Sequence, residues 1–153
     1  MGYYRPCPEL DECRRLIREY FETEQFEKCF QGHYPLAEKG YPLAECQVGY
    51  FYLDGLGVEK DEGKAFYWTK RAAEHGDRDG QYNLAEFYRE GVGTEPDMEK
   101  AKYWYLCAAK QEHDLAIEKC GELHLERKNE ESGGAGGNGY RRDACQAGMR
   151  NRR

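Results

Sequence analysis

Residues 46–76, CQVGYFYLDGLGVEKDEGKAFYWTKRAAEHG, align without a gap with residues 82–112, YNLAEFYREGVGTEPDMEKAKYWYLCAAKQE. The two stretches are offset by 36 residues and are identical at 12 of 31 positions. Such self-similarity at a fixed period is typical of repeat architectures, in which one supersecondary unit is stacked on the next. The chain is therefore expected to be a repeat protein rather than a globular domain with a single closed core.

Each unit has the pattern of two helices. In the first helix Val48 and Tyr52 keep helical spacing, and Gly55 is expected to end it because glycine tolerates the left-handed cap. Asp61 is expected to cap the second helix, since its side chain can accept a hydrogen bond from a free backbone N–H. The apolar face of that second helix recurs at i, i+3 and i+7, at Ala65, Trp68 and Ala72.

The same register extends in both directions along the chain. Residues 36–40 are similar to the end of the first unit at 72–76, and residues 120–122 are similar to the start of the second unit at 84–86. The sequence therefore predicts two nearly complete units with a half unit at each end.

A period of 36 residues with these residue types resembles the Sel1-like repeat family. The resemblance covers about residues 28–128 and is carried twice, first by Val48-Gly49, Tyr52, Gly55, Gly57, Asp61, Lys64-Ala65, Trp68 and Ala72-Ala73. It implies an all-α fold, a short α-solenoid of antiparallel helix pairs. It also implies a non-enzymatic role, because family members typically act as adaptors in protein complexes, often in bacterial signalling.

The N-terminal residues 1–23 are expected to form a capping helix, and the repeat array is expected over 24–128. Full units are placed at about 42–77 and 78–113, and a polar last helix is predicted over 114–128. The apolar residues of the capping helix would cover the first unit, namely Leu10, Cys13, Ile17 and Phe21.

Residues 129–153 are expected to form a disordered tail, Gly-rich at first and basic at its end. From Gly133 onward there are five arginines and one aspartate, whereas residues 1–132 have a net charge of −10. The opposite charges leave two alternatives open: a tail with no dedicated role, or an electrostatic arm that contacts an acidic surface, including the protein's own body.

The sequence shows no catalytic motif such as GxSxG, a P-loop or HExxH, and its Gly-x-Gly pairs belong to the repeat turns. We expect no catalytic residue, no cofactor and no metal. The four histidines are expected in turns or on the surface: His33, His75, His113 and His124.

Seven cysteines without a CxxC spacing are expected to be reduced thiols. The alternative is a metal- or redox-responsive cysteine protein, or a hydrolase with this fold. Cysteine-rich relatives associated with β-lactams carry paired cysteines at the positions of Ala73 and Gln81, and this chain lacks that pair.

The first helices of such pairs line the concave surface of a solenoid, which is where a partner is expected to bind. The predicted groove residues are Leu43, Cys46, Tyr50, Leu53, Asp54, Tyr82, Glu86, Arg89 and Glu90. Asp79 occupies the position in the second unit that corresponds to Leu43. The corresponding positions in the last half unit are Leu115, Glu118, Glu122, Leu125 and Glu126. The groove would change from apolar near Tyr50 to acidic toward Glu126.

The expected partner is a protein or peptide with an apolar anchor followed by basic residues. An acidic body disfavours nucleic acid and anionic membranes as partners. The first 21 residues contain no apolar stretch of the kind that signal peptides carry, so a cytoplasmic location is expected. We expect a monomer, and a piece of a longer array remains a further alternative.

Overall fold

The computed structural model describes residues 8–125, and every regular element in that range is helical. The predicted all-α solenoid is thereby confirmed. The elements are α1 (Pro8–Leu16), the π-helical turn η1 (Ile17–Phe21), α2 (Phe26–Glu38), α3 (Pro42–Asp54), α4 (Glu62–Glu74), α5 (Arg78–Glu90), α6 (Met98–Lys110) and α7 (Asp114–Glu122). None of these helices has the length and apolar character that crossing a membrane requires. The tail expected at 129–153 lies outside the described residues.

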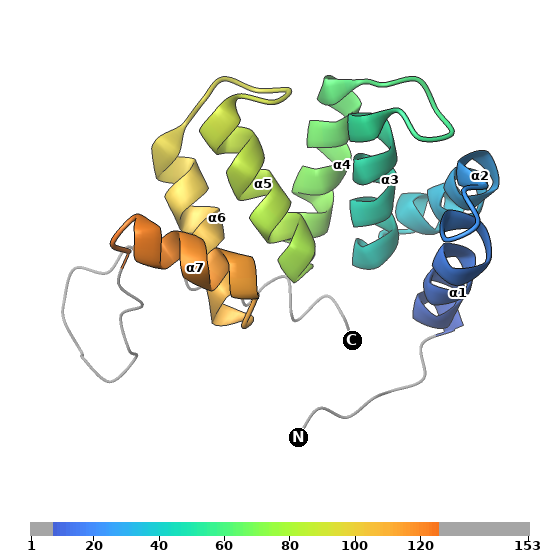
Figure 1. The fold of residues 1–153 in the computed structure, drawn as a ribbon, viewed down its shortest axis with the longest axis horizontal. Helices are drawn as coiled ribbons and strands as arrows, with labels where there is room; N and C mark the ends of the chain where they lie inside the picture. The colour runs from blue at the N-terminus through green and yellow to red at the C-terminus, as the bar shows by residue number, and fades with distance from the viewer. Residues whose placement is uncertain (1–7, 126–153) are drawn as a thin grey trace.

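The helices repeat at the period found in the sequence. Helices α2, α4 and α6 begin 36 residues apart, and so do α3, α5 and α7. Consecutive helices pack against one another along the chain, so that the pairs follow one another across the molecule (Figure 1). The array therefore has the nearest-neighbour packing of a solenoid.

Helix ends in the two full units form as the sequence predicts. Oδ1 of Asp61 accepts a hydrogen bond from the backbone N–H of Lys64 at 3.0 Å, and Asp97 caps α6 in the same way through Lys100 at 3.1 Å. Gly55 ends α3 with a left-handed φ of 67°, which confirms its predicted role.

The second glycine of each Gly-x-Gly loop contacts the preceding helix pair. A Cβ added to Gly57 would lie 2.4 Å from the backbone N of Glu27, at the start of α2. At the equivalent position, a Cβ on Gly93 would lie 2.4 Å from the carbonyl oxygen of Glu62, at the start of α4. Each loop thus approaches the preceding pair so closely that only glycine fits.

The N-terminal helix is the first member of a shortened pair. Leu16 lies against Gly32 of α2, and Sγ of Cys29 contacts the carbonyl oxygen of Leu16 at 3.6 Å. Glu19 and Phe21 occupy the positions that correspond to the two loop glycines. The chain turns instead through η1 and through Glu24, whose φ is 59°.

The last helix is shorter than expected. The sequence predicts a helix over 114–128, but α7 ends at Glu122. His124 takes a left-handed φ of 52°, and the amide of Leu125 donates to the carbonyl of Cys120 at 2.8 Å. These bonds satisfy the final carbonyls and turn the chain away from the helix axis.

We predict that Gly93→Ala lowers the free energy of unfolding by about 1–3 kcal/mol, because the methyl group meets backbone and a left-handed φ strains any other residue. Chemical denaturation followed by circular dichroism measures the change. The control is Gly121→Ala in α7, where an added Cβ meets nothing within 4 Å. Alanine there should leave stability unchanged or raise it by up to about 1 kcal/mol. Equal effects of both substitutions would contradict the packing argument.

Candidate functional site

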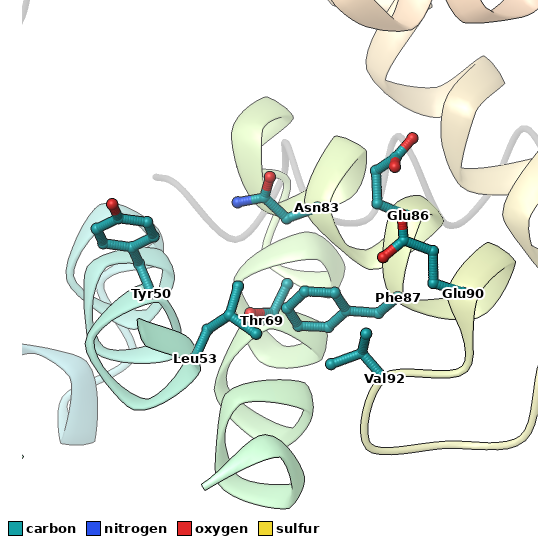
Figure 2. A pocket seen from close by; sticks show the side chains of 8 residues that line it. All are labelled: Tyr50, Leu53, Thr69, Asn83, Glu86, Phe87, Glu90 and Val92. Carbon is teal, nitrogen blue, oxygen red and sulfur yellow. The ribbon is translucent and has the colours of Figure 1, made fainter. Parts of the chain in front are cut away.

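The concave side of the array contains a hollow of about 240 Å³ between α3 and α5. In Figure 2, Leu53 projects from α3 toward Phe87 of α5, Tyr50 stands on the α3 side of the hollow, and Glu86 and Glu90 lie on its α5 side. The remaining lining comes from Thr69 on α4, Asn83 on α5 and Val92 in the loop after α5.

A second hollow of about 250 Å³ lies on the N-terminal side of the first. It is lined by Ile17 and Phe21 of η1, by α3 and α5 residues shared with the first hollow, and by Leu43, Cys46, Gln47 and Asp79. Because Tyr50 and Asn83 line both hollows, the two lie next to each other. We call the residues of the two hollows together the Tyr50 groove.

Six of the nine predicted groove residues line the Tyr50 groove: Leu43, Cys46, Tyr50, Leu53, Glu86 and Glu90. Asp79, at the same helical offset, lines it too. Tyr50 is 37% exposed, whereas Cys46 is only 6% exposed and contributes to the floor. The side chain of Tyr50 thus offers the main aromatic surface of the groove.

Asp54, Tyr82 and Arg89 line neither hollow. Tyr82 stacks on the ring of His113, with the ring centroids 4.8 Å apart. Asp54 forms a hydrogen bond with Tyr50, and together with burial this bond raises the pKa of the Tyr50 phenol. Tyr82 and Asp54 therefore make contacts within the fold.

Arg89 is held by three groups of its own neighbourhood. Its Nη2 donates to Glu86 at 2.7 Å and to Glu90 at 2.9 Å, and its Nε donates to the hydroxyl of Tyr105 at 3.2 Å. The Tyr105 hydroxyl in turn donates to Glu86. Burial alone would raise the pKa of Glu86, but the hydrogen bonds from Arg89 and Tyr105 outweigh it and lower the pKa. Glu86 is therefore a carboxylate fixed in place on the groove wall.

The groove also contains residues that the sequence argument did not select. They are Ile17, Phe21, Gln47, Thr69, Asn83, Phe87 and Val92. Gln47 and Asn83 lie 36 residues apart, next to predicted positions, so the repeat offset was the signal that could have found them. Ile17 and Phe21 carried no such signal, because they belong to η1.

The predicted positions in the last half unit lie apart from the groove. Leu115, Glu118 and Glu122 are exposed, and Glu122 pairs with Lys119 at 2.8 Å. Together with Leu125 they line neither hollow, and Glu126 lies outside the described residues. The groove is therefore confined to η1, α3, α4, α5 and the loop after α5.

Residues 8–125 contain no group of three or more His, Cys, Asp or Glu side chains that could hold a metal ion. Cys13, Cys29, Cys46 and Cys120 are free and buried, and burial raises the pKa of Cys29 to about 11. Cys107 is disulfide-bonded, so the expectation of reduced thiols is wrong for that residue.

One histidine prediction is also wrong. His33 is fully buried between α1, α2 and α3, where its Nδ1 lies 2.8 Å from the carbonyl oxygen of Cys29. Burial lowers the pKa of His33, outweighing hydrogen bonds to the Cys29 and Cys13 backbones that favour the charged form. His75, by contrast, is partly exposed and lies 2.5 Å from Glu45, a fully buried carboxylate of α3.

Comparisons with known proteins identify the family to which this fold belongs. Residues 42–77 and 78–113 each match the model of the Sel1 repeat. The crystal structure of a Sel1 repeat protein from Oxalobacter formigenes is 32% identical, with a TM-score of 0.65, over 74% of this chain and 86% of that one. This chain belongs to the Sel1 repeat family.

Two further similarities are partial. A protective antigen of uropathogenic Escherichia coli strains, described as displaying an SLR fold, is 25% identical with a TM-score of 0.69; the match covers 94% of this chain and 29% of the antigen. A chitin synthase regulator, SKT5 of Malassezia restricta, is 49% identical over 41 residues, which are 27% of this chain and 3% of the regulator. Sel1 repeat proteins are generally non-enzymatic scaffolds for protein interactions.

We predict that His33 makes the stability of the N-terminal pair depend on pH. Because the folded state holds the imidazole neutral, its stabilising effect is complete above the unfolded pKa of about 6.5 and is lost as the pH falls below it. The loss is at most about 1.4 kcal/mol per pH unit for one proton. Urea unfolding between pH 7.5 and pH 5 measures it.

In that series His33→Gln should be less stable at pH 7.5 but should lose less stability on acidification than the wild type. The control is His124→Asn, an exposed residue at a left-handed position that asparagine tolerates. It should keep the wild-type slope. Parallel curves for the wild type and His33→Gln would contradict the assignment.

Proposed function

We propose that this protein is an adaptor that binds a peptide or helical segment of a partner protein in the Tyr50 groove. The observation that carries the proposal is that the two hollows lie side by side and share Tyr50 and Asn83 in their lining. The N-terminal hollow contains the apolar side chains of Ile17, Phe21 and Leu43 together with Asp79. The other hollow combines Leu53, Phe87 and Val92 with the carboxylates of Glu86 and Glu90.

The apolar end suits an aliphatic or aromatic anchor. Phe21 lies 6.2 Å from the Tyr50 ring, centroid to centroid, so an inserted side chain would meet two aromatic faces. Aromatic residues of this kind are frequent hot spots of binding energy. The anchor would gain mainly from removal of apolar surface from water.

The acidic end suits Lys or Arg. Glu86 receives hydrogen bonds from both Arg89 and Tyr105, whereas Glu90 receives one from Arg89 and is exposed, so Glu90 is the better partner for an incoming cation. Asp79 lines the other hollow and lies 3.1 Å from His113. The order of these groups supports a ligand in which basic residues follow an apolar anchor.

Asn83 is placed to bind the main chain of such a ligand. Among the described residues its Nδ2 makes one long contact, 3.9 Å to Sγ of Cys46. An amide carries two donors and an acceptor, which match the N–H and C=O groups of an extended peptide. The contact would add affinity without adding sequence preference.

The cysteine-based alternative gains no support from the described thiols. Nucleophilic and redox-active cysteines are thiolates with a lowered pKa in accessible, electropositive sites. Burial instead raises the pKa of both Cys29 and Cys46. We therefore keep the adaptor function, with a single partner segment bound by a monomer.

A library of random 12-residue peptides displayed on phage, selected on the purified full chain, tests the proposal. We expect enrichment of peptides with an aromatic or aliphatic residue followed by Arg or Lys. Fluorescence anisotropy of an enriched peptide should show about tenfold weaker binding to Tyr50→Ala, as expected for the loss of about 1.4 kcal/mol at a hot spot.

Two matched controls make this test specific. Tyr67→Ala removes an exposed tyrosine (52%) on α4 that lines neither hollow. The second control, Glu74→Lys on α4, changes a glutamate to lysine outside the groove. It is matched to the same change within the groove, Glu90→Lys. Both controls should bind the peptide like the wild type. No enrichment, or equal losses in the controls, would rule out the groove as the binding site.

A further inference from the structure

The chain itself contains a segment with the chemistry that the Tyr50 groove requires. Residues 126–153 lie outside the described structure and follow Leu125, just past the end of α7. Within them Tyr140 is followed directly by Arg141 and Arg142. An aromatic anchor followed by two cations is the order inferred for a ligand from the groove alone.

The charges of the two parts are complementary. Residues 133–153 contain five arginines and one aspartate, whereas the rest of the chain is acidic. On the groove wall, Glu90 and Asp79 are exposed, and each already has one partner, Arg89 at 2.9 Å and His113 at 3.1 Å. Attraction between unlike charges at the short separations of a docked segment is only partly screened at physiological salt.

The length of the segment allows it to reach the groove. Fourteen residues, 126–139, separate Leu125 from Tyr140. Glycine-rich chains of this length have a root-mean-square span of about 20 Å, and about 45 Å when fully extended. Helix α7 lies at one end of the array and α1, which η1 follows, at the other (Figure 1), so the hollow beside Phe21 is the part of the groove farthest from Leu125. The segment therefore has to be extended, beyond its average span, to bring Tyr140 there.

We propose that Tyr140–Arg142 docks in the Tyr50 groove of the same molecule. Tyr140 would occupy the apolar end beside Phe21, and the two arginines would face Glu90 and Asp79. The inference rests on the proposed function, since it uses the same groove and ligand chemistry. Its consequence is regulation: a partner has to displace the chain's own C-terminal segment before it can bind.

Residues 1–7 contain a similar triplet, Tyr3-Tyr4-Arg5, and are the competing occupant within the chain. They carry one arginine, whereas the C-terminal segment carries five from Gly133 onward. They are also joined to the start of α1 by only two residues, Pro6 and Cys7. Charge and reach both favour the C-terminal segment.

The strength of the effect follows from effective concentration. A short flexible linker presents a tethered ligand at about 1 mM. If the free segment binds with a Kd of about 100 µM, the tether keeps the groove about 90% occupied and weakens binding of a competing peptide about tenfold. The chain's own segment can therefore inhibit binding of a partner even if its affinity for the groove is modest.

The probe is a fluorescent peptide of residues 137–153 in which Cys145 is replaced by serine, titrated into the full chain. The test variant is the triple substitution Tyr140→Ser, Arg141→Ser and Arg142→Ser. We expect it to bind the peptide about tenfold more tightly than the wild type does. The matched control is Met149→Ser, Arg150→Ser and Arg152→Ser, which also removes one apolar residue and two arginines. It should bind like the wild type.

The outcomes separate this inference from the proposed function. Equal affinity of the wild type and the test variant would overturn docking in cis, and the groove would remain a peptide site. Binding by neither would overturn docking of this segment, while the phage-selected peptides would still decide whether the groove is a peptide site. A gain in the control variant as large as in the test variant would overturn the assignment to Tyr140–Arg142. A gain on deleting residues 1–7 instead would identify that segment as the occupant and overturn the proposal.

A photo-crosslinking residue, p-benzoylphenylalanine, placed at position 140 of the full chain locates the docked side chain directly. Mass spectrometry should find intramolecular crosslinks to residues 42–54 and 78–90, which are the segments of α3 and α5. Adding Glu90→Lys should reduce them severalfold, while Glu74→Lys should not. Crosslinks confined to α4 and α6 would overturn the proposal.

Discussion

The contact on which the array depends is between backbone and backbone, where the second glycine of each loop meets the start of the second helix in the preceding pair. Gly57 lies against α2 and Gly93 against α4 in the same way. Since neither position leaves room for a Cβ, successive pairs are held at one separation. That separation sets the distance between α3 and α5, and with it the width of the groove.

The groove arises because the repeat conserves packing and varies the concave side. Trp68 and Trp104 occupy the same buried position in the two units, whereas Tyr50 corresponds to Glu86. Equivalent backbone positions therefore present an aromatic ring on one helix and a carboxylate on the next. A solenoid built on one repeat thus presents different side chains at equivalent positions without any change in its fold.

Most of the residues predicted on α3 line the hollows, whereas Tyr82 and Arg89 of α5 line neither. The helical offset selects side chains that point inward, but it says nothing about what else they contact. Tyr82 stacks on His113, and Arg89 binds Tyr105, so residues 16 or more positions away decide that both serve the fold. Phe21 was expected to cover the first unit and not to line a groove, because it belongs to a π-helical turn that has no counterpart in the other units.

The sequence by itself determined the period, the two full units and the helix ends at Asp61 and Gly55, because those depend on local preferences such as the Asp61 cap and the left-handed Gly55. Only the tertiary structure decided how the chain turns between α1 and α2, where α7 ends, and that His33 is buried. It also decided which polar groups of the concave side are free for a partner. These outcomes depend on contacts between residues far apart in the chain, which a local pattern does not record.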